Sequence, residues 1–133
     1  MTKTFCPIPW IFQAARSNGD VRVCCQANVT KNKGVVRKQD GTAYNTGIDN
    51  LSEARNGRLM KDIRKNMLSS KWSEECGRCR QEEENGLTSR RQYEQLQWKF
   101  SIIDAHEDNE KSAMSECSLN MGFDLIWMIK YRK

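Results

Sequence analysis

This sequence has few of the residues on which catalytic sites most often depend. Its 133 residues include one histidine, His106, and two prolines. It contains no nucleophile–base pair that we can identify and no phosphate-binding glycine loop, so an enzyme acting alone is the least supported class. His106 lies in a polar stretch among acidic residues, which favours a surface position over a role in ligation or catalysis.

Long apolar runs are also absent. The longest late run, Leu125 to Ile129, is far below the roughly 20 residues that a membrane span requires. Residues 1–15 form no secretory signal, because Pro7 and Pro9 interrupt the apolar stretch and no small-residue cleavage site follows. We therefore expect a cytoplasmic protein without a membrane association. In such a reducing compartment, cysteines are more often metal ligands or catalytic thiols than disulfides.

The composition points to a small core that needs additional support. Apolar residues make up 38% of the chain. A chain with so small a core often needs a cross-link or a bound metal in addition to apolar burial. Six cysteines could supply it. The net charge of +5 arises from 22 basic and 17 acidic residues, and the two signs are interspersed. This pattern favours a solvated basic surface, with nucleic-acid binding as the less favoured alternative.

The patterning predicts an α+β fold, with a small N-terminal β-hairpin followed by helices packed around a four-cysteine metal centre. Residues 10–15 could be extended, Asn18-Gly19 is a strong hairpin turn signal, and residues 21–24 alternate apolar and polar. Residues 26–50 suggest a long loop with a short strand at residues 34–37.

Helical patterns begin at Asn50, with Ser52 as the expected cap and a break at Asn56-Gly57. An apolar stripe at helical spacing predicts a core face; its members are Leu59, Met60, Ile63, Met67 and Leu68. A helix after Cys79 should stop at Asn85-Gly86. A further helix should place four apolar residues on one face: Tyr93, Leu96, Phe100 and Ile103.

Four cysteines are predicted to converge on one metal centre. Cys76 and Cys79 form a Cys-x-x-Cys pair, whose two thiols can reach one ion from a single turn. Cys6 precedes the predicted hairpin and Cys24 follows its second strand, so the hairpin should bring these two together. Four thiolates fit either a tetrahedral zinc site or a 4Fe-4S cluster. The dispersed spacing, with only one short pair, favours the cluster.

The remaining two cysteines are interpreted differently. Adjacent side chains of a strand point to opposite faces, so only one of Cys24 and Cys25 should face the site easily. We choose Cys24 as the ligand and keep Cys25 as a possible alternate ligand. Cys117 has no partner in its polar surroundings and is interpreted as a free thiol.

Several motifs together resemble the auxiliary-cluster domain of radical SAM enzymes, called twitch in its short form and SPASM in its long form. The motifs are Cys6-Pro7-Ile8-Pro9-Trp10, Gly19-x4-Cys24-Cys25, Cys76-x-x-Cys79 and Glu83-x-x-Gly86-x-x-Ser89-Arg90-Arg91. The resemblance covers about residues 4–95 and is to the one-cluster form. It implies a 4Fe-4S cluster held by Cys6, Cys24, Cys76 and Cys79. Residues 1–100 would form this domain, and residues 101–133 a poorly defined C-terminal extension.

The chain departs widely from the family, because the catalytic cysteine loop and the barrel that houses it are both missing and residues after about 100 no longer resemble it. Radical SAM catalysis uses a Cys-x3-Cys-x2-Cys loop, and no three cysteines here have that spacing. We therefore expect no S-adenosylmethionine binding by this chain alone. The resemblance implies a role in electron transfer, docking of a partner or substrate, or structural stabilisation. The expected partner is a separate radical SAM core chain or a redox protein.

The surroundings of the cluster can also be predicted. A 4Fe-4S cluster with four thiolate ligands carries net negative charge, which nearby cations stabilise. Arg78 and Arg80 flank the Cys-x-x-Cys pair, Arg22 lies near Cys24, and Arg90 and Arg91 lie one helix onward. Some of these should face the site. Trp10 could shield the cluster from water, although a core position is the favoured interpretation.

Overall fold

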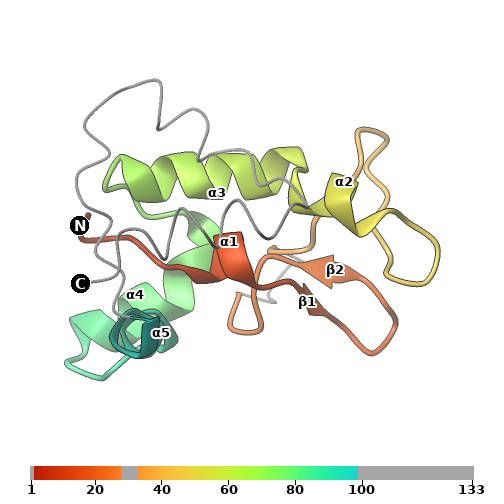
Figure 1. The fold of residues 1–133 in the computed structure, drawn as a ribbon. Coiled ribbons are helices and arrows are strands. Elements are labelled where there is room, and N and C mark those ends of the chain that lie inside the picture. Colours follow the sequence, from red (N-terminus) through yellow and green to blue (C-terminus); the bar gives the residue numbers. More distant parts are fainter. Residues whose placement is uncertain (1, 28–32, 99–133) are drawn as a thin grey trace.

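The computed structural model describes residues 2–27 and 33–98 (Figure 1). It confirms the α+β class: a short two-stranded antiparallel hairpin near the N-terminus is followed by helices. The elements in chain order are α1 (Ile8–Ile11), β1 (Ala14–Ala15), β2 (Val21–Arg22), α2 (Leu51–Arg55), α3 (Arg58–Leu68), the 3-10 helix η2 (Glu74–Cys76), α4 (Gly77–Glu84) and α5 (Arg90–Trp98). Within these residues, every helix is too short or too polar to span a bilayer. The predictions for His106, Phe100, Ile103 and Cys117 lie outside the described residues.

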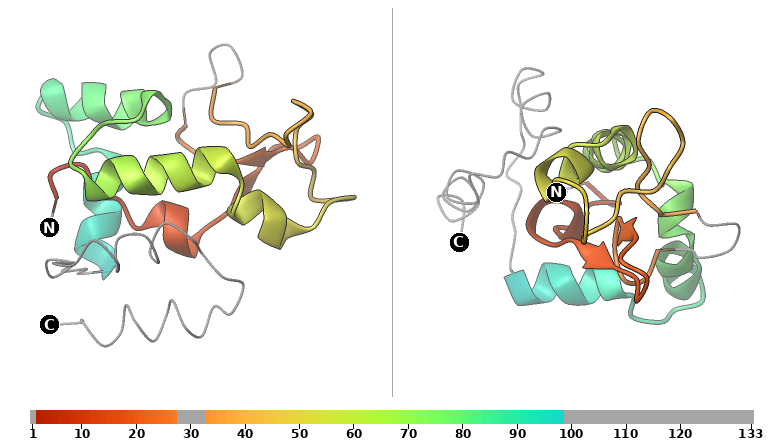
Figure 2. Two further views of the ribbon diagram at one scale, coloured as in Figure 1. Left: turned by 90° about the horizontal axis from the view of Figure 1, so that it is seen from above. Right: turned by 90° about the vertical axis from the view of Figure 1, so that its right-hand side faces the viewer.

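The longest helix, α3, organises the arrangement of the other elements. The hairpin and α2 lie towards one of its ends, and α4 and α5 lie towards the other (Figures 1 and 2). The short helix α1 packs against α3 between these two groups.

The hairpin forms where the Asn-Gly turn predicts it. Ala14 pairs with Arg22 and Ala15 with Val21. Gly19 has a φ of 88°, a backbone conformation that glycine adopts without steric cost. The backbone N–H of Arg16 donates to the Asp20 carbonyl at 2.9 Å and closes the turn.

The loop after the hairpin lies alongside β2. The Val36 N–H donates to the Val21 carbonyl, and the Val23 N–H donates to the Gly34 carbonyl. An isolated bridge joins Arg22 to Val35, in the region where a short strand was predicted. These bonds continue past the end of β2, so they fix the direction in which the chain reaches Cys24.

The predicted extended conformation of residues 10–15 is wrong at its start. Residues Ile8–Ile11 form the single helical turn α1, whose N-cap is Pro7. Pro9 lies in this first turn, where the fixed φ of proline suits a helix and its missing N–H costs no hydrogen bond. Trp10 therefore points from a helix into the core, where 3% of its surface is exposed.

The predicted helix break at Asn56-Gly57 is confirmed, because α2 ends at Arg55 and α3 begins at Arg58. The predicted cap is displaced by two residues. Asn50 is the N-cap of α2, and its side chain accepts a hydrogen bond from the Ser52 N–H at 2.8 Å. Both side chains can cap a helix, and the extended backbone at Asn50 decides between them.

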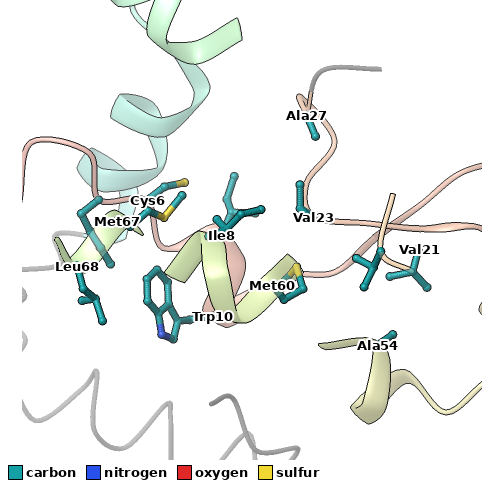
Figure 3. Close-up of a cluster of buried hydrophobic side chains, with 13 residues drawn as sticks. Cys6, Ile8, Trp10, Val21, Val23, Ala27, Ala54, Met60, Met67 and Leu68 are labelled. Atoms are coloured by element: carbon teal, nitrogen blue, oxygen red, sulfur yellow. The ribbon is translucent and has the colours of Figure 1, made fainter. Parts of the chain in front are cut away.

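The predicted apolar stripe of α3 forms the centre of the core. Its residues pack with Phe5, Trp10 and the valines of the hairpin region, and Leu59 is only partly buried. The ring centroids of Phe5 and Trp10 lie 5.2 Å apart. In Figure 3, Cys6 lies beside Met67 at one end of this cluster, and Val21 and Ala54 lie at the other. The first cysteine is thus part of the core.

Helix α4 ends as the Asn85-Gly86 pair predicts. Gly86 has a φ of 74°, its N–H donates to the Glu83 carbonyl, and the Leu87 N–H donates to the Glu82 carbonyl. These two bonds form a Schellman motif, which reverses the chain and begins the approach to α5.

Helix α5 exists as predicted, but the face that it buries is polar. Tyr93 is 48% exposed and Leu96 is 70% exposed. The buried side chains of the helix are instead Arg91 and Glu94. The physical reason is that Arg91 finds hydrogen-bond acceptors inside the protein, as described below, so its burial leaves no donor unsatisfied.

The Asn-Gly turn provides a test of the hairpin. Replacing Gly19 with alanine should destabilise the fold by about 2–3 kcal/mol, because an L-residue is strained at this φ and the new Cβ would lie 2.6 Å from Asn45 Oδ1. Asn45 Nδ2 donates to the Asn18 carbonyl, so its displacement also costs a hydrogen bond.

Gly41→Ala is the matched control, because Gly41 has a φ of 86° and open space around its Cβ position. It should cost only about 1 kcal/mol. Chemical denaturation of both variants measures the difference, and equal losses would contradict the proposed contact between Gly19 and Asn45.

Candidate metal centre

The four cysteines chosen from the sequence all line one pocket. Cys6 precedes α1, Cys24 follows β2, Cys76 ends η2 and Cys79 lies in the first turn of α4. Cys6 and Cys79 are buried, whereas Cys24 and Cys76 are partly exposed. Three segments that are far apart in the sequence therefore place their sulfur atoms around the same space.

Cys24 and Cys25 differ in the way the sequence predicts, but for a different local reason. Cys24 lines the pocket, whereas Cys25 is exposed. Strand β2 ends at Arg22, so neither cysteine lies in it, and Cys25 begins a turn. The turn rather than strand alternation directs Cys25 towards solvent.

Backbone N–H groups donate to three of the four sulfur atoms. The Ile8 N–H donates to Cys6, the Gln26 and Ala27 N–H groups donate to Cys24, and the Arg91 N–H donates to Cys79. Hydrogen bonds to sulfur stabilise a thiolate over a thiol. They are also the interactions by which a protein tunes an iron–sulfur cluster.

Burial nevertheless opposes ionisation of these thiols. It raises the pKa of Cys24 to about 11 and that of Cys76 to about 12, and it also raises the pKa values of Cys6 and Cys79. Repulsion among the four adds to the rise, since Cys6 interacts electrostatically with Cys24, Cys76 and Cys79. Four thiolates can share this pocket only if a positive centre offsets both costs.

The four thiols share a pocket without forming a tight group. In residues 2–27 and 33–98, no three side chains among His, Cys, Asp and Glu are arranged to hold a metal ion. A tetrahedral zinc ion with Zn–S bonds of about 2.3 Å needs sulfur atoms about 3.8 Å apart. The predicted packing around a four-cysteine metal centre is therefore not seen in the described residues, although all four cysteines line one pocket.

The cations around the pocket differ from those nearest in the sequence. Arg78 and Arg80 do not line the pocket; they lie on the exposed face of α4 and pair with Glu82 and Glu84. Arg78 is next to Cys79 in the sequence, but neighbours on a helix point about 100° apart. Arg22 also lies outside the lining, and one of its terminal nitrogens donates to the Ala27 carbonyl at 2.5 Å.

Arg90 and Arg91, named from the sequence as more distant candidates, do line the pocket. Trp10 does not, because its side chain belongs to the hydrophobic core. A different tryptophan, Trp72, lines it instead. Trp72 lies four residues before Cys76, and this proximity is the only sequence signal that could have indicated it.

Arg91 belongs to a buried network that no pattern analysis of single elements predicts. Its Nε donates to Glu83 Oε1 at 2.8 Å, and its second terminal nitrogen donates to Glu83 Oε2 at 2.5 Å. Ser89 Oγ also donates to Glu83 Oε1, at 2.5 Å. The motif Glu83-x-x-Gly86-x-x-Ser89-Arg90-Arg91 is thus a connected unit in space.

The ionised Glu83 carboxylate predicts a pH dependence of stability. Burial acts to raise the pKa of Glu83, but hydrogen bonds from Arg91 and Ser89 outweigh it and hold that pKa below its usual value of 4.5. The pair therefore stabilises the fold above about pH 4.5, and this contribution is lost as pH falls through the lowered pKa.

Glu83→Gln should accordingly cost about 2–3 kcal/mol at neutral pH, since it leaves a buried guanidinium without its counter-charge. Denaturation of both proteins across a pH series measures the loss. The difference between them should shrink below about pH 4.5, and a difference that stays constant down to acid pH would contradict the proposed ion pair.

Comparison with known proteins identifies no relative of this chain. No family model, curated protein or solved structure matches this chain. The functional interpretation therefore depends on the residues of the pocket themselves.

Proposed function

We propose that this chain binds a 4Fe-4S cluster through Cys6, Cys24, Cys76 and Cys79 and acts as an auxiliary-cluster domain of a radical SAM-like system. The observation that carries the proposal is the shared pocket, in which these four thiols meet from three separate segments. Buried free cysteines would not need to gather at one place, and thiolates gathered there would repel one another unless a cation lay between them.

The spacing of the cysteines in the sequence favours a cluster over a single ion, because only Cys76 and Cys79 form a short Cys-x-x-Cys pair. A cubane is larger than an ion, so its ligands can arrive from separate elements. A zinc module with the same four ligands remains the alternative, and metal content separates the two.

The rest of the pocket suits an anionic cofactor. Arg91 supplies a buried positive charge, and apolar side chains such as Ile8, Val23 and Met67 exclude water. Arg90 is half exposed and pairs with Glu94, and the acidic Glu75 also lines the pocket. A buried positive charge and the exclusion of water are both means by which a protein sets the potential of an iron–sulfur cluster. When bound, the cluster would supply one-electron chemistry.

The ligand set limits the role that we assign. With a cysteine at each of its four corners, the cluster would have no open iron for a substrate. Electron transfer or structural stabilisation therefore fits better than substrate binding at iron. A separate radical SAM core chain or a redox protein would be the partner, and S-adenosylmethionine would bind that core rather than this chain.

Anaerobic reconstitution with iron and sulfide tests the proposal. The purified protein should take up about four irons per chain and develop a broad visible absorbance. Replacing Cys6, Cys24, Cys76 or Cys79 singly with serine should abolish or strongly reduce both signals. It should also lower the thermal midpoint, because metal binding contributes directly to folding.

Cys25→Ser is the matched control, since Cys25 is adjacent to a proposed ligand but exposed. It should retain full iron content. Tight zinc binding with no iron uptake by the wild-type protein would contradict the cluster proposal and support the zinc alternative.

A further inference from the structure

The Glu83-to-Arg91 motif has no part in ligation, yet it lies against the pocket. We propose that Arg91 is a positioning residue which presents a fixed positive charge to the cluster and thereby raises its reduction potential. This inference rests on the proposed function, because it requires a cluster in the pocket. Its observations concern the guanidinium group, its partners and its orientation.

The guanidinium of Arg91 is held on every side. Glu83 binds it through both carboxylate oxygens, and its first terminal nitrogen donates to the Phe5 carbonyl at 3.1 Å. Its Cζ atom lies 5.4 Å from the centroid of the Trp72 ring. Only 7% of Arg91 is exposed. An arginine constrained in this way keeps its charge in one place, since the fork of donors is rigid and does not lose its proton.

The ion pair of Arg91 and Glu83 is oriented with respect to the pocket. Arg91 lines the pocket, whereas Glu83 does not. The positive end of the pair therefore faces the thiols, and the negative end lies behind it. The attraction between this positive end and a cluster in the pocket would favour the reduced cluster, which carries one more negative charge than the oxidised cluster.

Arg91 also joins the segments that carry the ligands. Phe5, whose carbonyl it binds, precedes Cys6, and its own backbone N–H donates to the Cys79 sulfur. Trp72, under its guanidinium, lies shortly before Cys76. A purely structural role for Arg91 is therefore the competing explanation, and the experiment must separate position from charge.

Two substitutions with opposite electrostatic consequences make that separation. Arg91→Gln removes the cation and should shift the potential of the reconstituted cluster to a more negative value. Glu83→Gln removes the counter-charge while Phe5 and Trp72 still hold Arg91, so it should shift the potential to a more positive value. Each change should be about tenfold in the reduction equilibrium, or about 59 mV for one electron.

One control removes a positive charge outside the pocket, and the other keeps the positive charge at position 91. Arg80→Gln removes a charge from the exposed face of α4 and should leave the potential unchanged. Arg91→Lys keeps the charge and should remain closer to wild type than Arg91→Gln. Spectroelectrochemical titration of each protein gives the potentials, and iron content confirms loading.

The outcomes distinguish this inference from the function on which it depends. Wild-type protein that binds no iron would overturn the proposed function. A loaded wild type whose potential is unaffected by either substitution, or moves in the same direction in both, would overturn the role of Arg91 alone. If Arg91→Gln fails to fold, the reduction potentials of Glu83→Gln and Arg91→Lys still test the role of Arg91. A potential of Glu83→Gln that is not more positive than that of the wild type would overturn that role.

Discussion

The cost of burying four sulfur atoms in one pocket is the constraint to which the other features of the site respond. Water is excluded from thiols whose ionised forms would repel one another, so the pocket needs donors and positive charge before it can hold thiolates. Backbone N–H groups supply the donors at Cys6, Cys24 and Cys79. Arg91 supplies the buried charge.

Buried arginines also secure the chain around Cys6. Residues 5–10 form no ladder with another strand, and carbonyls in this segment would otherwise be buried without partners. Arg91 donates to the Phe5 carbonyl, Arg64 donates to the Pro9 carbonyl at 3.1 Å, and Arg55 donates to the Trp10 carbonyl. Three guanidinium groups thus fix the segment that carries the first proposed ligand.

Sequence patterns predicted those features that depend on local chemistry. Gly19 and Gly86 mark turns because each has a positive φ. Asn56-Gly57 separates two helices through the extended backbone of Gly57, whose φ is −59° and ψ 155°. The patterns failed where long-range contacts decide. Arg78 is beside Cys79 in the sequence but does not line the pocket, whereas Arg91 lines it from α5, a separate helix. Burial of Arg91 instead of Tyr93 likewise depends on acceptors, Glu83 and the Phe5 carbonyl, that come from other segments.

Because the proposed ligands are far apart in the sequence, forming the site requires the fold to close long loops. Bringing Cys24 to Cys76 closes a long loop, and the entropic cost of closure rises slowly, by about 0.6 kcal/mol for each doubling of length. Residues of α2 and α3 pack in one core with Val21 and Val23, so apolar burial contributes to closing this loop. A metal centre joining Cys6, Cys24, Cys76 and Cys79 would have to offset the burial and mutual repulsion of the thiolates. In a chain with so small a core, the same centre would tie the N-terminal segment, the hairpin and α4 into one unit.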